Sequence, residues 1–136
     1  MEKIRAIIVG YGNIGKYVLE AIQASPDFEL VGVLRRSTAG EQPAELADVL
    51  VVEDLDKIKD FQVAILCTPT RSVEAYAKKI LAMGKNTVDS FDIHGSIWDL
   101  HKTLDPIAKE NNSVAVISAG WDPGSDSIVR SMMEAI

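Results

Sequence analysis

The sequence contains little of several features that mark specialised proteins. Its one cysteine, Cys67, cannot form an internal disulfide and is typical of a protein kept in a reducing compartment. Basic residues are outnumbered 14 to 20, and the net charge of −6 argues against a general nucleic-acid binder, which usually carries a basic patch. No apolar run approaches the roughly 18 residues of a membrane span, and no signal-peptide pattern precedes the first apolar run. We therefore expect a cytoplasmic protein that binds neither nucleic acid nor membrane.

The chain has the composition and length of one ordinary domain. It has 136 residues, of which 47% are hydrophobic and 25% charged, as in soluble globular proteins. Short runs rich in β-branched residues alternate with helical patterns. Strands are expected at residues 4–9, 28–34, 49–52, 63–67, 87–89 and 114–118.

The first two helical patterns carry start and stop signals. Ile14, Val18 and Ile22 recur four residues apart, which predicts one buried face of a first helix. Ser72 is expected to cap a second helix, and Gly84 is its natural C-terminal stop.

Two further helices complete the alternation. One is expected from 96 to 112 with a kink or a break at Pro106, and the last begins at about Ser127. Six strands alternating with helices predict an α/β fold, a doubly wound parallel sheet of the Rossmann dinucleotide-binding type. We expect residues 1–136 to form this one dinucleotide-binding domain.

A glycine-rich segment lies between the first expected strand and the first expected helix. Gly10-Tyr11-Gly12-Asn13-Ile14-Gly15 matches G-x-G-x-x-G. In that setting the first glycine permits a tight turn, the second lets a pyrophosphate approach the backbone, and the third allows helix and sheet to pack closely. The N–H groups at the helix N-terminus are then available to the phosphates.

The residues about twenty positions further on indicate which cofactor binds. An NAD-binding domain normally places an acidic residue there, on the ribose hydroxyls. This sequence has Arg35-Arg36-Ser37-Thr38, whose guanidinium and hydroxyl groups suit a 2′-phosphate, with no carboxylate in the segment to repel it. The segment favours NADP over NAD.

Cys67-Thr68-Pro69-Thr70 follows the fourth expected strand, at the sheet edge where ligands bind. Cys67 is interpreted as a buried, inert thiol because no histidine or second cysteine is near it in sequence. His101 is expected on a helix surface, and His94 is left unassigned. Neither histidine has metal-ligand spacing, so no metal site is predicted.

Two acidic segments follow the last two expected strands. They contain Asp92 and Asp122, which adjacent strand ends would bring to one cleft, where paired carboxylates can hold an ammonium group. Both residues are equally consistent with simple turn caps. The spacing alone leaves the two interpretations open.

These motifs together resemble the meso-diaminopimelate D-dehydrogenase family. The resemblance covers all 136 residues and rests on IRAIIVGYGNIGK, the arginine-serine turn, TVDSFD and SAGWDPG. It implies an NADP-dependent enzyme that oxidatively deaminates the D-centre of meso-2,6-diaminopimelate to L-2-amino-6-oxopimelate and ammonia. The reverse direction feeds lysine biosynthesis. It also implies a cytoplasmic homodimer.

The resemblance assigns roles to particular residues. Asp92, Trp121 and Asp122 would hold the D-amino-acid centre. The residues that would line NADP are Gly10, Tyr11, Gly12, Asn13, Ile14, Gly15, Arg35, Arg36, Ser37, Cys67, Thr68, Pro69, Thr70, Ser90, Phe91, Asp92, Ala119, Gly120, Trp121, Asp122 and Pro123. The substrate domain of this family would follow Ile136. Residues 1–136 would then be the NADP-binding domain, the N-terminal part of a longer two-domain chain, and the chain alone is expected to be inactive.

Two alternatives remain. A sugar dehydrogenase of the glucose–fructose oxidoreductase type also has a strand, Cys-Thr-Pro, a helix and Gly-Lys in this order. That type requires Glu-Lys-Pro where this chain has Asp89-Ser90-Phe91. A free-standing NADP-binding or sensing module fits the length. The Trp121-Asp122-Pro123-Gly124 segment counts against it, because a sensor needs no ammonium-binding carboxylates.

Overall fold

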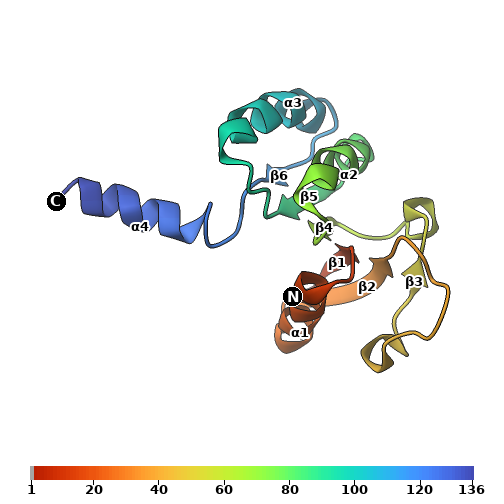
Figure 1. Cartoon of the computed structure of the whole chain (residues 1–136). Helices are drawn as coiled ribbons and strands as arrows, with labels where there is room; N and C mark the ends of the chain where they lie inside the picture. Colours follow the sequence, from red (N-terminus) through yellow and green to blue (C-terminus); the bar gives the residue numbers. More distant parts are fainter. Residues whose placement is uncertain (1) are drawn as a thin grey trace. The chain divides into compact units, whose positions relative to one another are not determined.

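A computed structural model describes residues 2–136, which form two compact units, one up to Thr68 and one from Pro69 to Ile136. The first unit contains four strands and one α-helix, and the second contains two strands and three α-helices (Figure 1). Strands are present at all six places where the sequence predicts them.

The first unit is built on a four-stranded parallel sheet. Its strands are β1 (Ile4–Val9), β2 (Phe28–Leu34), β3 (Val51–Val52) and β4 (Val63–Leu66), in the order β3-β2-β1-β4. The last four residues of β1 are fully buried, as expected for a central strand of a parallel sheet. The chain leaves β1 toward β2 on one side and returns to β4 on the other, which makes the β1/β4 end a topological switch point.

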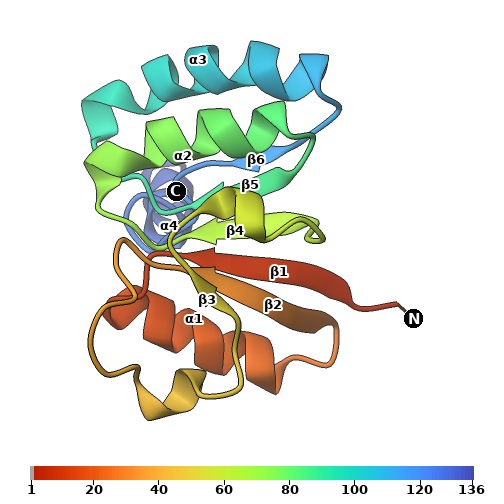
Figure 2. The same cartoon turned by 90° about the vertical axis from the view of Figure 1, so that its right-hand side faces the viewer.

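Helix α1 (Asn13–Ala24) covers this sheet in the first unit (Figure 2). Its buried residues are Gly15, Leu19 and Ile22, and two of them join the core cluster with Ala6, Ile8, Val33 and Leu46. The predicted face is wrong at Ile14, which is 59% exposed. Helical spacing fits two adjacent stripes, residues 14, 18 and 22 or residues 15, 19 and 22. Because Gly15 lies close to the loop, the second stripe faces the sheet.

The second unit pairs two strands and two helices. Strand β5 (Asn86–Asp89) runs parallel to β6 (Ala115–Val116), and helices α2 (Thr70–Ala82) and α3 (Ile97–Glu110) pack side by side over them (Figure 2). Val73, Ala77, Ile80 and Leu81 of α2 are buried, and so are three residues of α3 at helical spacing, Leu100, Leu104 and Ala108.

The helix ends depart from the sequence prediction in two places. Helix α2 begins at Thr70, after Pro69, so Ser72 lies inside the first turn and is not the cap. Proline fixes the backbone angle that leads into a helix, and α2 therefore starts three residues earlier than a cap at Ser72 would place it. Helix α3 continues through Pro106 without a break, because the buried side chains around the proline hold the turn against the sheet. Gly84 is confirmed as a stop: with φ of +71° it forms the glycine-terminated end of α2.

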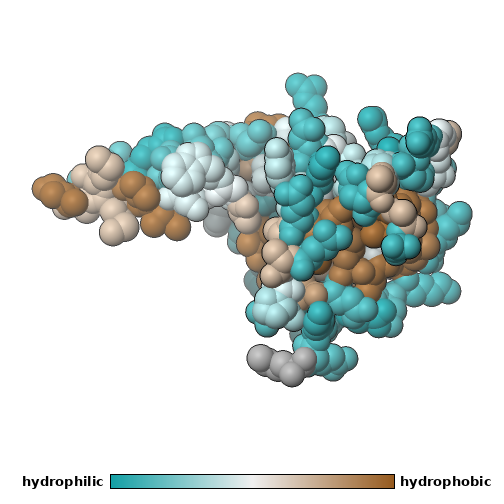
Figure 3. All heavy atoms as spheres, turned by 90° about the horizontal axis from the view of Figure 1, so that it is seen from below, coloured by the Kyte–Doolittle hydropathy of each residue, from teal (hydrophilic) through white to brown (hydrophobic). Residues whose placement is uncertain are grey.

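The C-terminal helix is the least buried element of the second unit. Strand β6 is two residues long, and helix α4 (Ser125–Glu134) begins two residues before the expected start. None of its residues is buried, and Ile128, Val129, Met132 and Met133 are between 48% and 70% exposed. Figure 3 shows hydrophobic side chains along this segment, at the left of the view. Two short 3-10 turns, η1 (Ala44–Leu46) and η2 (Leu55–Lys57), lie in the first unit, and η3 (His94–Ser96) lies in the second.

A membrane span is not found among the helices of residues 2–136, none of which is long and apolar enough to cross a bilayer.

Candidate functional site

The β1–α1 loop has the backbone geometry of a dinucleotide cradle. Gly10 adopts φ of +91°, and a Cβ there would lie 2.8 Å from the carbonyl oxygen of Cys67. A Cβ on Gly15 would overlap the carbonyl oxygen of Gly10, so neither position accepts a side chain. Gly12 differs, because a Cβ there would meet nothing within 4 Å. The loop therefore requires Gly10 and Gly15 for its own packing and leaves open space at Gly12.

The N-terminus of α1 points its unsatisfied N–H groups toward this loop. Gly12 is the N-cap and offers no side-chain oxygen, and the first turn contains no acidic residue. The positive end of the helix dipole is therefore not neutralised by the helix itself. Asn13 and Ile14 are exposed in this first turn. Such an end is suited to a phosphate group.

The end of β4 lies beside the glycine loop, as the sequence predicts. The Cys67 N–H donates to the Val9 carbonyl at 2.8 Å, and the Cys67 carbonyl faces Gly10. Burial raises the pKa of the Cys67 thiol to about 11, so this thiol is protonated at neutral pH. Cys67 is half-buried, not fully buried as the sequence predicts, and its raised pKa agrees with the interpretation of an inert thiol. The boundary between the two units falls between Thr68 and Pro69 of this segment.

The arginine turn after β2 is organised by side-chain hydrogen bonds. Arg35 donates from Nη1 to Oε1 of Gln42 at 2.6 Å, and the Gln42 amide donates to the Thr38 carbonyl at 3.0 Å. Ser37 Oγ accepts the Ala39 N–H at 3.1 Å. Arg36 is exposed, and among residues 2–136 its guanidinium has no hydrogen-bond or ion-pair partner. Arg36 is thus the guanidinium of this turn that is free to meet an anion.

The expectation that no carboxylate lies at this turn is wrong. Oε1 of Glu53 accepts both the N–H of Thr38, at 2.5 Å, and its hydroxyl, at 2.8 Å. These bonds hold the pKa of Glu53 below its ordinary value, which leaves the side chain ionised at neutral pH. The cause is non-local: β3 pairs with β2 in the register Leu34↔Val52, so the residue after β3 lies beside the residues after β2.

A second carboxylate approaches the glycine loop itself. Tyr11 donates its hydroxyl to Glu45 at 3.3 Å, and Lys16 pairs with the same carboxylate at 3.4 Å. Partial burial and the Glu45 charge raise the pKa of Tyr11. These contacts fix the Tyr11 side chain against η1.

In the second unit, the ends of β5 and β6 are brought together. The Ala119 N–H donates to the Asp89 carbonyl at 2.7 Å, and a Cβ on Gly120 would lie 3.7 Å from Cβ of Ser90. The Asp92 N–H donates to Oγ1 of Thr70 at 3.2 Å, which ties this segment to the start of α2. The predicted site residues Thr70, 90–92 and 119–123 therefore form one local group.

Asp122 has partners that sequence reasoning missed. Arg130 of α4 donates to Oδ2 of Asp122 at 2.8 Å and also pairs with Asp126. Nε2 of His94 lies 3.8 Å from the other oxygen, Oδ1. Asp126 and Asp122 raise the pKa of Arg130. Asp122 is more than a turn cap, since it takes part in a charged cluster.

Other features of this segment are its exposure and its backbone. Trp121 is 72% exposed, Asp92 is exposed, and Pro123, which follows a cis peptide bond, is buried. Spacing along α4 would have suggested the Asp126–Arg130 pair, but not the pair across the loop.

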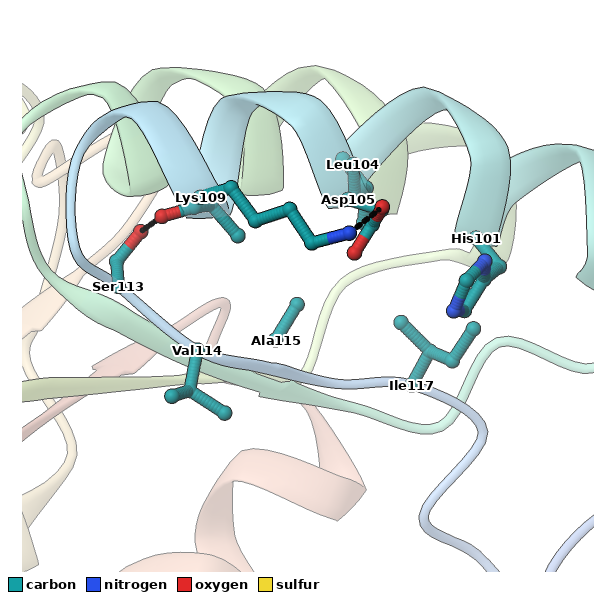
Figure 4. Close-up of a pocket in the computed structure, with 9 residues that line it drawn as sticks. His101, Leu104, Asp105, Lys109, Ser113, Val114, Ala115 and Ile117 are labelled. Atoms are coloured by element: carbon teal, nitrogen blue, oxygen red, sulfur yellow. Dashed lines mark hydrogen bonds and ion pairs between the residues drawn. The ribbon is translucent and has the colours of Figure 1, made fainter.

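A pocket of about 210 Å³ lies between α3 and the β6 segment, away from the predicted residues (Figure 4). Its lining comprises His101, Leu104, Asp105, Ala108, Lys109, Ser113, Val114, Ala115 and Ile117. The opposite charges within it, Lys109 and Asp105, pair with each other at 2.7 Å. His101 stacks on Trp98 at the surface, as expected for a helix-surface histidine. Among the described residues, no group of three metal-ligating side chains is found.

A parallel sheet whose switch point carries a glycine cradle and an uncapped helix defines the class of Rossmann-type dinucleotide-binding proteins. Residues 4–89 match the family described as "Oxidoreductase family, NAD-binding Rossmann fold", and the chain belongs to this family. The predicted fold class is confirmed.

Individual relatives are more specific than the family. The chain is 67% identical, over all its residues and 46% of the relative, to a Bacteroides fragilis protein named meso-diaminopimelate D-dehydrogenase. It resembles an engineered D-amino acid dehydrogenase bound to NADP⁺, with a TM-score of 0.86 and 33% identity over 98% of this chain and 41% of that one. It also resembles the C. glutamicum DAP dehydrogenase in complex with DAP, with a TM-score of 0.82 and 35% identity over 99% and 42%.

The resemblance stated from the sequence is confirmed by these comparisons. The chain spans less than half the length of these relatives.

Proposed function

We propose that this chain is the NADP(H)-binding part of an enzyme that oxidatively deaminates the D-centre of meso-2,6-diaminopimelate. The products would be L-2-amino-6-oxopimelate and ammonia, and the reaction is reversible. The observation that carries the proposal is the local group of Asp92 and the 119–122 segment, which places carboxylates on neighbouring strand ends in a chain 67% identical to a meso-diaminopimelate D-dehydrogenase.

The cofactor proposal rests on the first unit. The open space at Gly12 and the uncapped start of α1 fit a diphosphate, and neither feature is needed to fill the core. The free guanidinium of Arg36 fits a 2′-phosphate by charge-assisted hydrogen bonds. Glu53 lies at the same turn, but its Oε1 atom is already engaged by Thr38. We infer a preference for NADP over NAD. When bound, the cofactor supplies the acceptor for a hydride.

The second unit would bind and orient the substrate. Asp92 and Asp122 would accept hydrogen bonds from the substrate ammonium and so fix the orientation of the Cα–H bond, with the exposed indole of Trp121 next to Asp122 in the sequence. Oxidation removes a hydride from Cα and a proton from nitrogen. Water then adds its oxygen to that carbon, and ammonia leaves. The residues of this chain position the reacting centre throughout and need form no covalent bond.

Arg130 constrains how Asp122 works. Its guanidinium occupies Oδ2 of Asp122, so the oxygen available to a substrate ammonium is Oδ1, on the side of His94. The charge-assisted hydrogen bond from Arg130 also holds the Asp122 carboxylate in place when no substrate is bound.

The test uses a chimera, because the relatives are more than twice as long as this chain. The chain replaces the matching segment of the B. fragilis protein, and turnover of meso-diaminopimelate is followed by the absorbance of reduced cofactor. We expect turnover with NADP⁺. Asp92→Asn and Asp122→Asn should each lower kcat/KM at least tenfold while NADPH affinity stays within about threefold, since the phosphate contacts lie in the first unit.

Asp99→Asn, on the exposed surface of α3, is the matched control and should behave as the unmodified chimera. A chimera without turnover, while the unmodified B. fragilis protein is active, would contradict the proposed substrate. If either site variant keeps the parental kcat/KM, that residue is a strand-end cap and not a substrate ligand.

A further inference from the structure

Asp89 is the one acidic side chain in the buried core of the second unit as the structure describes it. It is the last residue of β5 and is 2% exposed. Its Oδ1 atom accepts the N–H of Phe91 at 2.9 Å and the N–H of Ser118 at 3.1 Å. One oxygen atom therefore holds two backbone segments that are 27 residues apart in sequence.

Ser118 and its neighbour also bond back to the β5 segment. Its hydroxyl donates to the Phe91 carbonyl at 2.8 Å, and its neighbour Ala119 donates an N–H to the Asp89 carbonyl at 2.7 Å. Ser118 has φ of +56°, a left-handed conformation that a residue with a side chain adopts only when its surroundings hold it. The bonds to Asp89 and Phe91 are what hold it here.

An ordinary turn cap explains only half of this arrangement. A terminal Asp that closes the turn after its strand needs the bond to Phe91 alone. The bond to Ser118 crosses to the other segment and caps nothing in the β5 turn. Burying a carboxyl group is unfavourable, and the second oxygen, Oδ2, is buried without a hydrogen-bond partner among residues 2–136. A cap at the surface would make the same turn without that burial.

The two joined segments carry the proposed substrate ligands. Asp92 follows Phe91 directly, and Asp122 lies four residues beyond Ser118. We propose that Asp89 is a positioning residue: through Oδ1 it holds residues 90–92 against residues 118–122 and so fixes the spacing of Asp92 and Asp122. This deepens the proposed function and rests on it for the consequence in turnover, while the hydrogen bonds themselves are testable in the chain alone.

The first test measures backbone amide exchange by NMR in the 136-residue chain. Asp89→Ala should raise the exchange rates of the Phe91 and Ser118 N–H groups at least tenfold, without raising those in β1. Asp89→Asn keeps an oxygen at Oδ1 and should return both rates to within about threefold of the parent. Thr87→Val is the matched control, because Thr87 is equally buried on the same strand and its hydroxyl has no partner to lose among the described residues.

The second test uses the chimera with the B. fragilis protein. Asp89→Ala should lower kcat/KM for meso-diaminopimelate at least tenfold, Asp89→Asn should restore most of it, and Thr87→Val should leave it unchanged. NADPH affinity should stay within about threefold throughout. If Asp89→Ala does not fold, Ser118→Gly takes its place: it loses only the hydroxyl bond to Phe91 and should lower kcat/KM at least threefold.

The outcomes separate the two proposals. Unchanged exchange at Phe91 and Ser118 in Asp89→Ala, or an active chimera whose kcat/KM this variant does not lower, overturns the positioning role. An Asn variant as impaired as the Ala variant also overturns it, because Oδ1 would then not be the atom that matters. A parental chimera that binds NADPH but does not turn over meso-diaminopimelate overturns the proposed substrate. In that case, faster amide exchange at Phe91 and Ser118 in Asp89→Ala would still support the role of Asp89 in holding the two segments together.

Discussion

At the scale of single residues, the arginine turn is the feature that we propose selects NADP over NAD. Among residues 2–136 the Arg36 guanidinium has no hydrogen-bond or ion-pair partner, whereas Arg35 donates to Gln42. Replacing Arg36 with Ala should therefore weaken NADPH binding by about 1.5–3 kcal/mol, the scale of a hydrogen bond to a charged group, and leave NADH binding nearly unchanged. Titration of the chain with each cofactor by fluorescence measures both affinities.

The neighbouring carboxylate provides the control for that titration. Glu53→Gln removes a negative charge from the turn but keeps an oxygen that accepts from Thr38. It should therefore tighten NADPH binding modestly and leave NADH binding unchanged. Equal losses for both cofactors in the Arg36 variant would show that the turn does not recognise the 2′-phosphate.

Cys67 provides a pH prediction at the same scale. Its pKa is raised by burial to about 11, above the roughly 8.5 of an exposed thiol. The thiol should therefore react slowly with iodoacetamide at about pH 8 and speed up only as the pH approaches 11. Because the folded pKa lies above the unfolded one, the group's contribution to stability is full below about pH 8.5 and is lost as the pH rises through 11.

Mass spectrometry of the alkylated chain over a pH series measures this, with Cys67→Ser as the blank. Rapid labelling at neutral pH, at a rate matching a small free thiol, would be inconsistent with an inert buried cysteine.

At the scale of elements, the β1–α1 loop separates folding from binding. Gly12 has open space where a Cβ would stand and an ordinary φ of −104°, so Gly12→Ala should leave the Tm unchanged. The added methyl group would occupy the position proposed for the diphosphate and should weaken NADPH binding at least tenfold. Gly95→Ala, also in open space but in η3, should change neither quantity.

Thermal unfolding and cofactor titration of the two variants are the measurements. If the Gly12→Ala variant binds NADPH as tightly as the parent, the diphosphate must lie elsewhere.

The same elements show how far the sequence determines the site. The glycine loop, the strands and the stop at Gly84 were predictable because each depends on residues close together in the chain. Glu53 was not, because its position follows from the pairing of β3 with β2. The role of Asp89 depends likewise on β6 lying beside β5. Ile14 was misplaced because a helical spacing of four fits two neighbouring stripes, and only the packing at Gly15 selects one.

At the scale of the whole molecule, the two units carry different parts of the proposed reaction. The features that we propose bind phosphate belong to the unit that ends at Thr68, and the carboxylates that we propose bind the substrate ammonium belong to the unit that begins at Pro69. The relatives are more than twice as long as this chain, while diaminopimelate has two carboxylates and two amino groups to be recognised. We therefore expect the isolated 136-residue polypeptide to bind NADPH and to show no sustained turnover of meso-diaminopimelate.

Helix α4 should govern how that polypeptide behaves in solution. Ile128 and Met132 are each 64% exposed on a helix without a buried residue, and contiguous apolar surface of this kind drives association. Size-exclusion chromatography with light scattering should show self-association that the double variant Ile128→Ser, Met132→Ser abolishes. NADPH affinity should stay unchanged, because the proposed phosphate contacts lie in the other unit. Val114→Ser is the matched control, since Val114 is 59% exposed but lies outside α4. If the double variant associates as strongly as the parent while Val114→Ser becomes monomeric, then the chains associate through the apolar edge beside β6 and not through α4.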